Sequence, residues 1–294
     1  MLLAVPNCSE GRTLDAVREI VNAFQSEATA LLDFHFDTGH NRTVVTLAGE
    51  PRELAGALLT GARAASESID MRTHAGAHPC VGALDVCPLV YLRPEDVEAA
   101  ERAALGVADA IADRLEIPVF LYGGLATSAE RRERAYFRRG GLPELARRMR
   151  EGELKPDRGP DEPHLTAGAT LVTARPPLAA FNLRLDKRDL DAARAIAGEL
   201  RESGGGLPGV RAIALELEDG IQISTNVHDP VAVPLARVVA EVERIGSRYE
   251  ARPAMAEFVG LVPEAALDGF PSALALADPD LDAHVIERRL AELG

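Results

Sequence analysis

Cysteine is scarce in this sequence, which holds three such residues, Cys8, Cys80 and Cys87, among 294. An odd and sparse set argues against a disulfide framework and favours free thiols in a reducing compartment. The N-terminus, "MLLAVPNCSEG", has neither the basic start nor the long apolar core of a signal peptide. No run reaches the roughly 18 apolar residues that a membrane span needs. We therefore expect a cytoplasmic protein.

Positive charge is also in deficit, because 32 Lys and Arg face 46 Asp and Glu, for a formal net charge of -14. This balance argues against a nucleic-acid partner, whose phosphates require a basic face, and does not favour anionic membranes. It does not exclude small anionic substrates, because a few arginines can focus a positive field inside one pocket. The expected partner is a small molecule.

The order of periodic segments predicts two α/β halves. The first half has the order strand, helix, strand, strand, helix, strand. This half continues with a further helix, a strand and an arginine-rich stretch over 129–150 that is expected to be helical. The second half repeats the βαββαβ order without obvious sequence similarity to the first. Each half therefore resembles an α+β sandwich, a sheet with helices on one face.

A stretch rich in Pro, Gly and charge, "EGELKPDRGPDEPHLTAGA", separates the halves at residues 151–169. Connections of this length are uncommon inside compact domains and are often functional. We place the boundary just after it, which gives an N-terminal part at 1–176 and a C-terminal part at 177–294 with a terminal helix.

Four of the seven histidines lie in two short clusters, "DFHFDTGHNRT" and "HAGAHP". On a strand, Asp33, His35 and Asp37 would share one face. Turn geometry is an equal explanation for Asp37 and Asn41, since such residues are typical of hairpin turns. From the bare residues, His78 is more often a loop histidine with one backbone hydrogen bond than a catalytic group.

Other motifs are weak or missing. His74 and His78 are four apart, which would align zinc ligands only on a helix, and Gly76 and Pro79 oppose a helix there. The glycine-rich "ESGGGLPG" follows a helix and not a strand, so it is no phosphate-binding loop. The sequence has no GxSxG and no Walker motif, and Cys87 in an apolar strand reads as a small buried hydrophobe.

Seven segments in the same order together resemble the glutamate formiminotransferase family, including the formiminotransferase part of formiminotransferase-cyclodeaminase. They are "VPNCSEG", "NRTVVTLAG", "HAGAHPCVGALDVCPLV", "IPVFLYG", "AFNLRL", "QISTN" and "EFVGLVP". The likeness runs from about residue 3 to about residue 264, so we expect no cyclodeaminase domain in this chain.

The resemblance implies transfer of the formimino group of N-formimino-L-glutamate to tetrahydrofolate, giving 5-formiminotetrahydrofolate and glutamate in histidine breakdown and one-carbon metabolism. It also implies two subdomains whose sheets face each other across a folate groove, a homodimer, tetrahydrofolate as co-substrate and no metal.

The family's proposed acid/base histidine corresponds to His78. Such a group is useful because the attacking N5 must lose a proton and the departing nitrogen must gain one, near neutral pH. Both reactants carry carboxylates, for which Arg42, Arg72 and Arg184 are candidate cations, with surface salt bridges as the alternative for the last two. The candidate substrate and folate contacts are Asn7, Ser9, Glu10, His35, Asp37, His40, Asn41, Arg42, His74, Cys80, Gly82, Asn182 and Asn226.

The chain departs from the family pattern close to His78. Cys80 stands where many members carry Arg, Ala75 and Ala77 replace Lys and Glu, and His35 replaces an aspartate for which Asp37 is a substitute. These changes favour, as a second hypothesis, a paralogue that keeps the folate groove but uses another donor or only binds. A third is a metal-dependent amidohydrolase built on His35, Asp37, His40 and His78. A thiol at Cys80 with a lowered pKa is a further open possibility.

Overall fold

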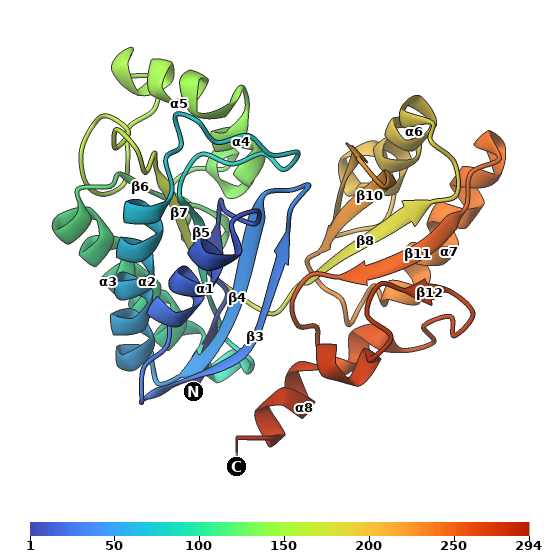
Figure 1. The fold of residues 1–294 in the computed structure, drawn as a ribbon, viewed down its shortest axis with the longest axis horizontal. Coiled ribbons are helices and arrows are strands. Elements are labelled where there is room, and N and C mark those ends of the chain that lie inside the picture. The colour runs from blue at the N-terminus through green and yellow to red at the C-terminus, as the bar shows by residue number, and fades with distance from the viewer. Residues whose placement is uncertain (294) are drawn as a thin grey trace. The chain divides into compact units, whose positions relative to one another are not determined.

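The computed structural model describes residues 1–293, and Figure 1 shows its ribbon. The chain divides into two compact units, the first covering Met1–Arg175 and the second beginning at Pro176. Each unit has its own β-sheet with helices packed against it. The predicted α/β class is therefore confirmed.

A seven-stranded mixed sheet forms the centre of the first unit. The two short N-terminal strands both pair with β4 on one side and β5 on the other. Strand β3 pairs antiparallel with β4, whereas β5, β7 and β6 run parallel. The strands are β1 (Leu2–Ala4), β2 (Asn7–Cys8), β3 (Thr29–Asp37), β4 (Arg42–Gly49), β5 (Leu84–Val90), β6 (Val119–Leu121) and β7 (Thr170–Arg175).

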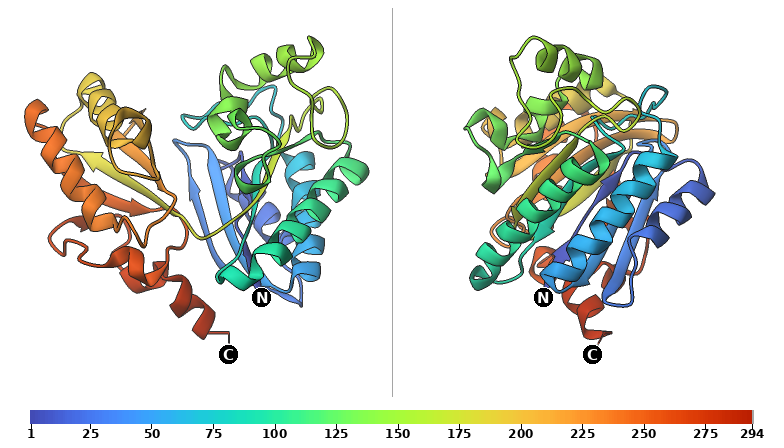
Figure 2. Two further views of the ribbon diagram at one scale, coloured as in Figure 1. Left: turned by 180° about the vertical axis from the view of Figure 1, so that it is seen from behind. Right: turned by 90° about the vertical axis from the view of Figure 1, so that its left-hand side faces the viewer.

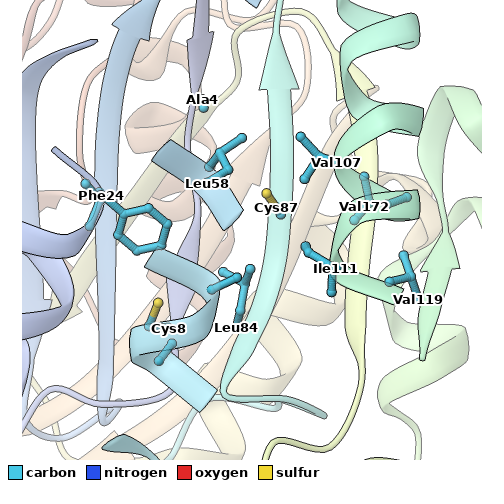
Figure 3. Close-up of a cluster of buried hydrophobic side chains, with 14 of the residues drawn as sticks. Ala4, Cys8, Phe24, Leu58, Leu84, Cys87, Val107, Ile111, Val119 and Val172 are labelled. Carbon is cyan, nitrogen blue, oxygen red and sulfur yellow. The ribbon is translucent and has the colours of Figure 1, made fainter. Parts of the chain in front are cut away.

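Three helices cover one face of this sheet, as Figure 2 shows. Their apolar side chains and alternate residues of the strands form one core, in which Leu58, Cys87 and Val172 are fully buried (Figure 3). The prediction that Cys87 is a buried hydrophobe is confirmed. The helices are α1 (Leu14–Ala23), α2 (Pro51–Ser68) and α3 (Val97–Leu115).

Strand β7 has no counterpart in the elements predicted from the sequence. It lies between β5 and β6, where Leu171 is the register partner of both Val86 and Phe120. A strand buried on both faces loses the alternation that marks a half-exposed one, and this one follows directly on a Pro- and Gly-rich stretch. That stretch, 151–169, forms turns and isolated bridges without helix or strand, as expected.

The arginine-rich stretch at 129–150, predicted to be helical throughout, is broken. It contains α4 (Arg134–Arg138) and α5 (Gly141–Arg150), separated where Gly140 and Gly141 adopt φ values of +74° and +70°. This left-handed conformation ends a helix and is easily reached only by glycine. Phe137 of α4 packs on Phe120, in a second cluster on the sheet face opposite α1–α3.

The second unit has the predicted βαββαβ order, with one short strand added. Its five-stranded sheet has the order β12-β11-β8-β10-β9, and α6 and α7 pack on one face of it. The elements are β8 (Ala179–Leu185), α6 (Leu190–Leu200), β9 (Val210–Leu217), β10 (Gly220–Val227), α7 (Leu235–Gly246), β11 (Pro253–Phe258) and β12 (Ala275–Leu276).

The terminal helix predicted for the second unit is α8 (Ile286–Ala291). Its N-terminal residue is tied to the unit, because the Ile286 N–H donates to the Val262 carbonyl at 2.9 Å. Across the described residues 1–293, none of the helices has the length and apolar character needed to cross a membrane.

Two glycines of α2 provide a test of the packing between α1 and α2. A Cβ on Gly61 would lie 2.1 Å from the Phe24 ring, whereas a Cβ on Gly56 would meet nothing within 4 Å. We expect Gly61→Ala to destabilise the protein by about 1–3 kcal/mol through overpacking. Gly56→Ala should stabilise it by up to about 1 kcal/mol through helix propensity. Urea unfolding measures both, and equal midpoints for the two variants would contradict this packing.

Candidate active site

A β-bulge aims a carboxylate away from the helical core of the first unit. Leu84 and Cys87 both belong to the core beneath α1–α3, so the two residues between them, Asp85 and Val86, point to the other face. The pairing of β5 with β2 shifts register at this place. Bulges commonly re-aim a side chain next to an active site.

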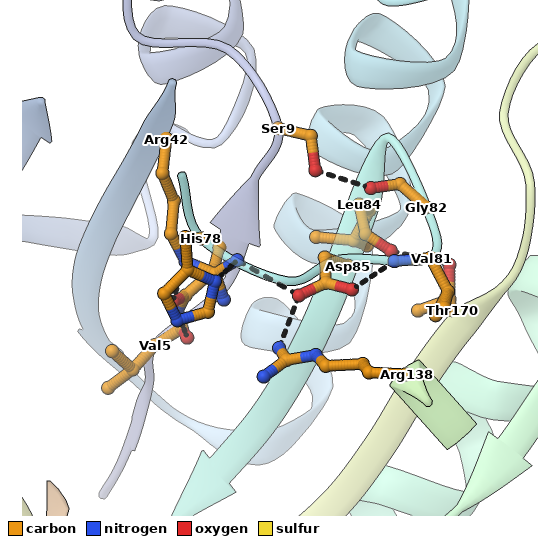
Figure 4. A network of polar contacts seen from close by, with 11 residues as sticks. Val5, Ser9, Arg42, His78, Val81, Gly82, Leu84, Asp85, Arg138 and Thr170 are labelled. Carbon is orange, nitrogen blue, oxygen red and sulfur yellow. Dashed lines mark hydrogen bonds and ion pairs between the residues drawn. The ribbon is translucent and has the colours of Figure 1, made fainter. Parts of the chain in front are cut away.

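The Asp85 carboxylate is fully buried and receives donors on both oxygens (Figure 4). Oδ2 accepts from Arg42 at 2.9 Å and from Arg138 of α4, and Oδ1 accepts from the Val81 N–H at 2.9 Å. Burial alone would raise the pKa of Asp85, but the two guanidiniums and this N–H lower it on balance. The carboxylate is therefore charged and joins α4 to the sheet.

Arg42 connects this carboxylate to His78. Its Nε donates to Asn7 Oδ1 at 3.0 Å, and Nη1 lies 2.9 Å from Asp85 and 3.2 Å from His78 Nδ1. A guanidinium only donates hydrogen bonds, so Nδ1 must be the acceptor and the hydrogen of a neutral His78 ring lies on Nε2. The guanidinium predicted to bind substrate is thus occupied by protein groups.

The charges around His78 oppose its protonation. Its pKa is lowered well below 6.5, first by burial and then by Arg42, Arg138, His40 and Arg134. The His40 ring stacks on the His78 ring with centroids 5.9 Å apart. His78 is therefore a neutral imidazole at pH 7, with Nε2–H as the nitrogen that the Arg42 contact leaves available.

Hydrogen bonds to its backbone atoms hold the loop that carries His78 against the turn after β3. Asn41 Nδ2 donates to the Ala75 carbonyl at 3.1 Å and lies 3.3 Å from His74 Nδ1, while the Ala77 N–H donates to the Gly39 carbonyl at 3.1 Å. Asn41 Oδ1 also accepts from the Gly11 N–H at 2.9 Å. Asn41, with φ at +51°, thus fastens three segments at one turn.

Several predicted site residues hold this architecture in place. Asp37 Oδ1 accepts from the His40 N–H at 2.5 Å, and Glu10 Oε1 accepts from the N–H groups of Arg12 and Thr13 ahead of α1. The register of β3 places His35 and Asp37 on the same sheet face as Arg42. Glu10 and Asp37 therefore have structural partners within the protein.

Ser9, Cys80 and Gly82 are the remaining predicted site residues of the first unit. The Ser9 hydroxyl donates to the Gly82 carbonyl at 2.7 Å, and a Cβ on Gly82 would come within 1.9 Å of the Ala169 carbonyl oxygen. Burial and the Asp85 charge raise the pKa of the Cys80 thiol. The possibility of a thiol with a lowered pKa at Cys80 is therefore wrong.

The second unit places its two predicted residues on the sheet face that α6 and α7 leave uncovered. Asn182 pairs across the strands with Ser224, and Asn226 lies two residues further along the same face. The Asn182 amide donates to Glu257 at 2.8 Å, and Gln222 donates to the same carboxylate at 3.2 Å. This face carries a cluster of amides around one acid.

The other two predicted cations form surface pairs. Arg72 is exposed and binds Asp70 through both carboxylate oxygens, and Arg184 pairs with the exposed Asp219 at 2.8 Å. The salt-bridge alternative thus describes both residues.

The sequence analysis did not identify three charged residues of the site: Asp85, Arg134 and Arg138. A single carboxylate within the apolar "LDVCPLVYL" was a usable signal, because a charge in a buried strand requires a partner. Nothing local pointed to the two arginines, of which Arg138 lies 53 positions from Asp85.

Metal ligation finds no support in the arrangement of side chains. Within residues 1–293, no group of three or more His, Cys, Asp or Glu side chains is placed to hold a metal ion.

Comparison with known proteins gives matches along most of the chain. The sequence profile of the formiminotransferase domain, N-terminal subdomain, matches residues 1–175. A glutamate formimidoyltransferase of Streptococcus pyogenes serotype M1 is 36% identical over 290 residues, which cover 97% of this chain and 97% of that protein.

Relatives from other lineages show the same level of similarity. A glutamate formimidoyltransferase of Thermoplasma acidophilum is 37% identical over 268 residues, or 90% of this chain and 88% of that protein. The formimidoyltransferase-cyclodeaminase of Sus scrofa is 36% identical over 272 residues, which are 90% of this chain and 50% of that longer protein.

Removing the Asp85 charge should cost much stability. Asp85→Asn leaves Arg42 and Arg138 as buried cations without a counter-charge, and we expect a loss of about 3–5 kcal/mol. The control Asp70→Asn breaks the exposed pair with Arg72 and should cost about 1 kcal/mol or less. Chemical denaturation compares the two, and similar losses would contradict the role assigned to Asp85.

The lowered pKa of His78 predicts how stability depends on pH. The unfolded chain takes up a proton at His78 near pH 6.5 and the folded protein only at lower pH, so acidification favours unfolding. We expect wild-type stability to fall between about pH 7 and about pH 5 more steeply than that of His78→Gln. Parallel curves from urea titrations across this range would refute a neutral His78.

Proposed function

The chain belongs to the formiminotransferase family and is a transferase of that class, and we propose that it moves the formimino group of N-formimino-L-glutamate to N5 of tetrahydrofolate. The observation that supports this proposal most is His78, a neutral imidazole among arginines in an acidic protein. Both proposed reactants carry carboxylates, which such surroundings attract.

In the proposed reaction His78 moves a proton between two nitrogens. N5 of the folate attacks the formimino carbon, and the carbon–nitrogen bond to glutamate then breaks. Nε2 can accept a proton only when the ring hydrogen is on Nδ1, so in this proposal the Arg42 contact with Nδ1 is released when the substrates bind. Nε2 then takes the proton that N5 loses and gives it to the departing glutamate nitrogen. The ring is a transient imidazolium between the two transfers, and the carboxylates of the reactants offset the guanidiniums that disfavour it.

Arg42 is a positioning residue in this proposal. Its contacts with Asn7 and Asp85 fix the guanidinium, and the guanidinium in turn orients the His78 ring before the substrates bind. Arg42→Lys would keep a positive charge but lose the fork that reaches all three partners.

The remaining candidates divide into supporting residues and proposed ligand contacts. Ser9, Glu10, Asp37, Asn41 and Gly82 hold the strands and loops around His78. Five residues are retained as proposed substrate or folate contacts: His35, His40, His74, Asn182 and Asn226. The proposal also includes tetrahydrofolate as co-substrate, no metal, a role in histidine breakdown and one-carbon metabolism, and a cytoplasmic homodimer.

A second candidate is a folate-binding relative that uses another formimino or one-carbon donor. Ala75, Ala77 and Cys80 favour it, because three residues near His78 differ from the common family pattern. Against it, Arg42, Arg134 and Arg138 already surround His78 with positive charge, so an arginine at position 80 is not needed for that purpose. We therefore rank formiminoglutamate first.

The decisive experiment follows 5-formiminotetrahydrofolate from formiminoglutamate and tetrahydrofolate with wild type and His78→Ala. We expect turnover by wild type and a loss of more than about a hundredfold in the variant, since proton transfer of this kind contributes about 10²–10⁴. The control Arg72→Ala, at an exposed pair outside the site, should keep wild-type rates.

Two results would count against the proposal. Saturable binding of tetrahydrofolate by wild type without product would favour the second candidate, with another donor. Full activity in His78→Ala would remove His78 from the proton path.

A further inference from the structure

Arg134 stands apart from the other charged groups near His78. Within residues 1–293, its guanidinium has no hydrogen-bond or ion-pair partner, although the side chain is largely buried. Burial lowers the pKa of Arg134, and Arg138 and Arg42 act in the same direction. A cation in this position is costly unless an anion compensates it.

The protein offers too little negative charge at this place. Asp85 is the one carboxylate among the groups that shift the His78, Arg42 and Arg134 pKa values, and its oxygens already serve Arg42, Arg138 and the Val81 N–H. Three guanidiniums therefore share a single carboxylate. Three positive charges against one negative charge leave this group of side chains with a net positive charge.

Arg134 and Arg138 are four positions apart on α4, so their side chains emerge on the same side of the helix. Arg138 Nε is buried and has no partner in the described chain. Two other arginines nearby in the sequence have carboxylate partners: Arg131 binds Asp157 at 2.9 Å and Arg147 binds Glu144 at 2.8 Å. Unsatisfied donors are thus concentrated on the side of α4 that faces Asp85 and His78.

We propose that Arg134 binds the α-carboxylate of the formimino donor, with Arg138 Nε as a neighbouring donor. This inference rests on the proposed function. The α-carboxylate is attached to the same carbon as the nitrogen that leaves, so a group bound there holds the breaking bond near His78. A planar guanidinium matches a carboxylate with two parallel hydrogen bonds.

Kinetics on wild type, Arg134→Met, Arg134→Lys and the exposed control Arg132→Met test the assignment. We expect Arg134→Met to raise KM for formiminoglutamate about tenfold to about a hundredfold and to leave KM for tetrahydrofolate unchanged. Arg134→Lys should recover part of the loss, and Arg132→Met should match wild type. Circular dichroism and unfolding midpoints verify that each variant is folded.

A donor whose α-carboxylate is replaced by an amide separates charge recognition from a general structural effect. Wild type should discriminate against the amide by about the same factor that Arg134→Met loses, and the variant should treat acid and amide alike. A variant that still prefers the acid by the wild-type factor, or whose KM rises for tetrahydrofolate alone, would overturn the assignment.

Failure of the proposed function would be visible separately. If wild type does not turn over formiminoglutamate, calorimetry with L-glutamate, the product that keeps the α-carboxylate, still probes the subsite. Binding by wild type that Arg134→Met abolishes would support the anion site without the reaction. Equal binding by both proteins, or none by either, would refute it.

Discussion

The contact on which the site depends is the buried Asp85 carboxylate between two guanidiniums. It joins strand β4, through Arg42, to helix α4, through Arg138, although these elements are distant in the sequence. A buried ion pair is weak evidence for stability, because desolvation offsets much of the attraction. It nevertheless fixes the positions of its members, because removing one of them leaves another as a buried charge without a counter-charge. Asp85 thereby fixes Arg42, and Arg42 fixes the ring of His78.

The local electrostatics oppose those of the whole molecule. The chain carries a formal charge of -14, yet the groups around His78 include three arginines and one carboxylate. Surface acids are screened by solvent, whereas these guanidiniums act at short range in a buried setting. An acidic protein can therefore attract anionic substrates at one place while remaining repulsive to polyanions elsewhere.

Most elements of the fold were predictable because their periodicity is local. The second unit shows the expected βαββαβ order, and the strands and helices up to β6 lie where their patterns indicate, apart from the two-residue strand β2, which was not predicted. Strand β7 escaped prediction because burial on both faces removes its alternation, and α4 and α5 because Gly140 and Gly141 break an otherwise helical composition. His78 and Arg42 were predicted as site residues from a family resemblance, and the structure brings them within 3.2 Å of each other. Arg134 and Arg138 reach the site only through tertiary packing, which no local pattern encodes.

The anchoring of the His78 loop has a consequence for protein engineering. The loop is held by the Ala75 carbonyl and the Ala77 N–H, which are present whatever the side chains at these positions. Residues 75 and 77 can therefore be randomised while the His78 loop keeps its support from Asn41 and Gly39. A library at these positions would vary the side chains next to His78 with little effect on folding. Gly76 must stay fixed, because a Cβ there would lie 2.4 Å from the His40 carbonyl oxygen.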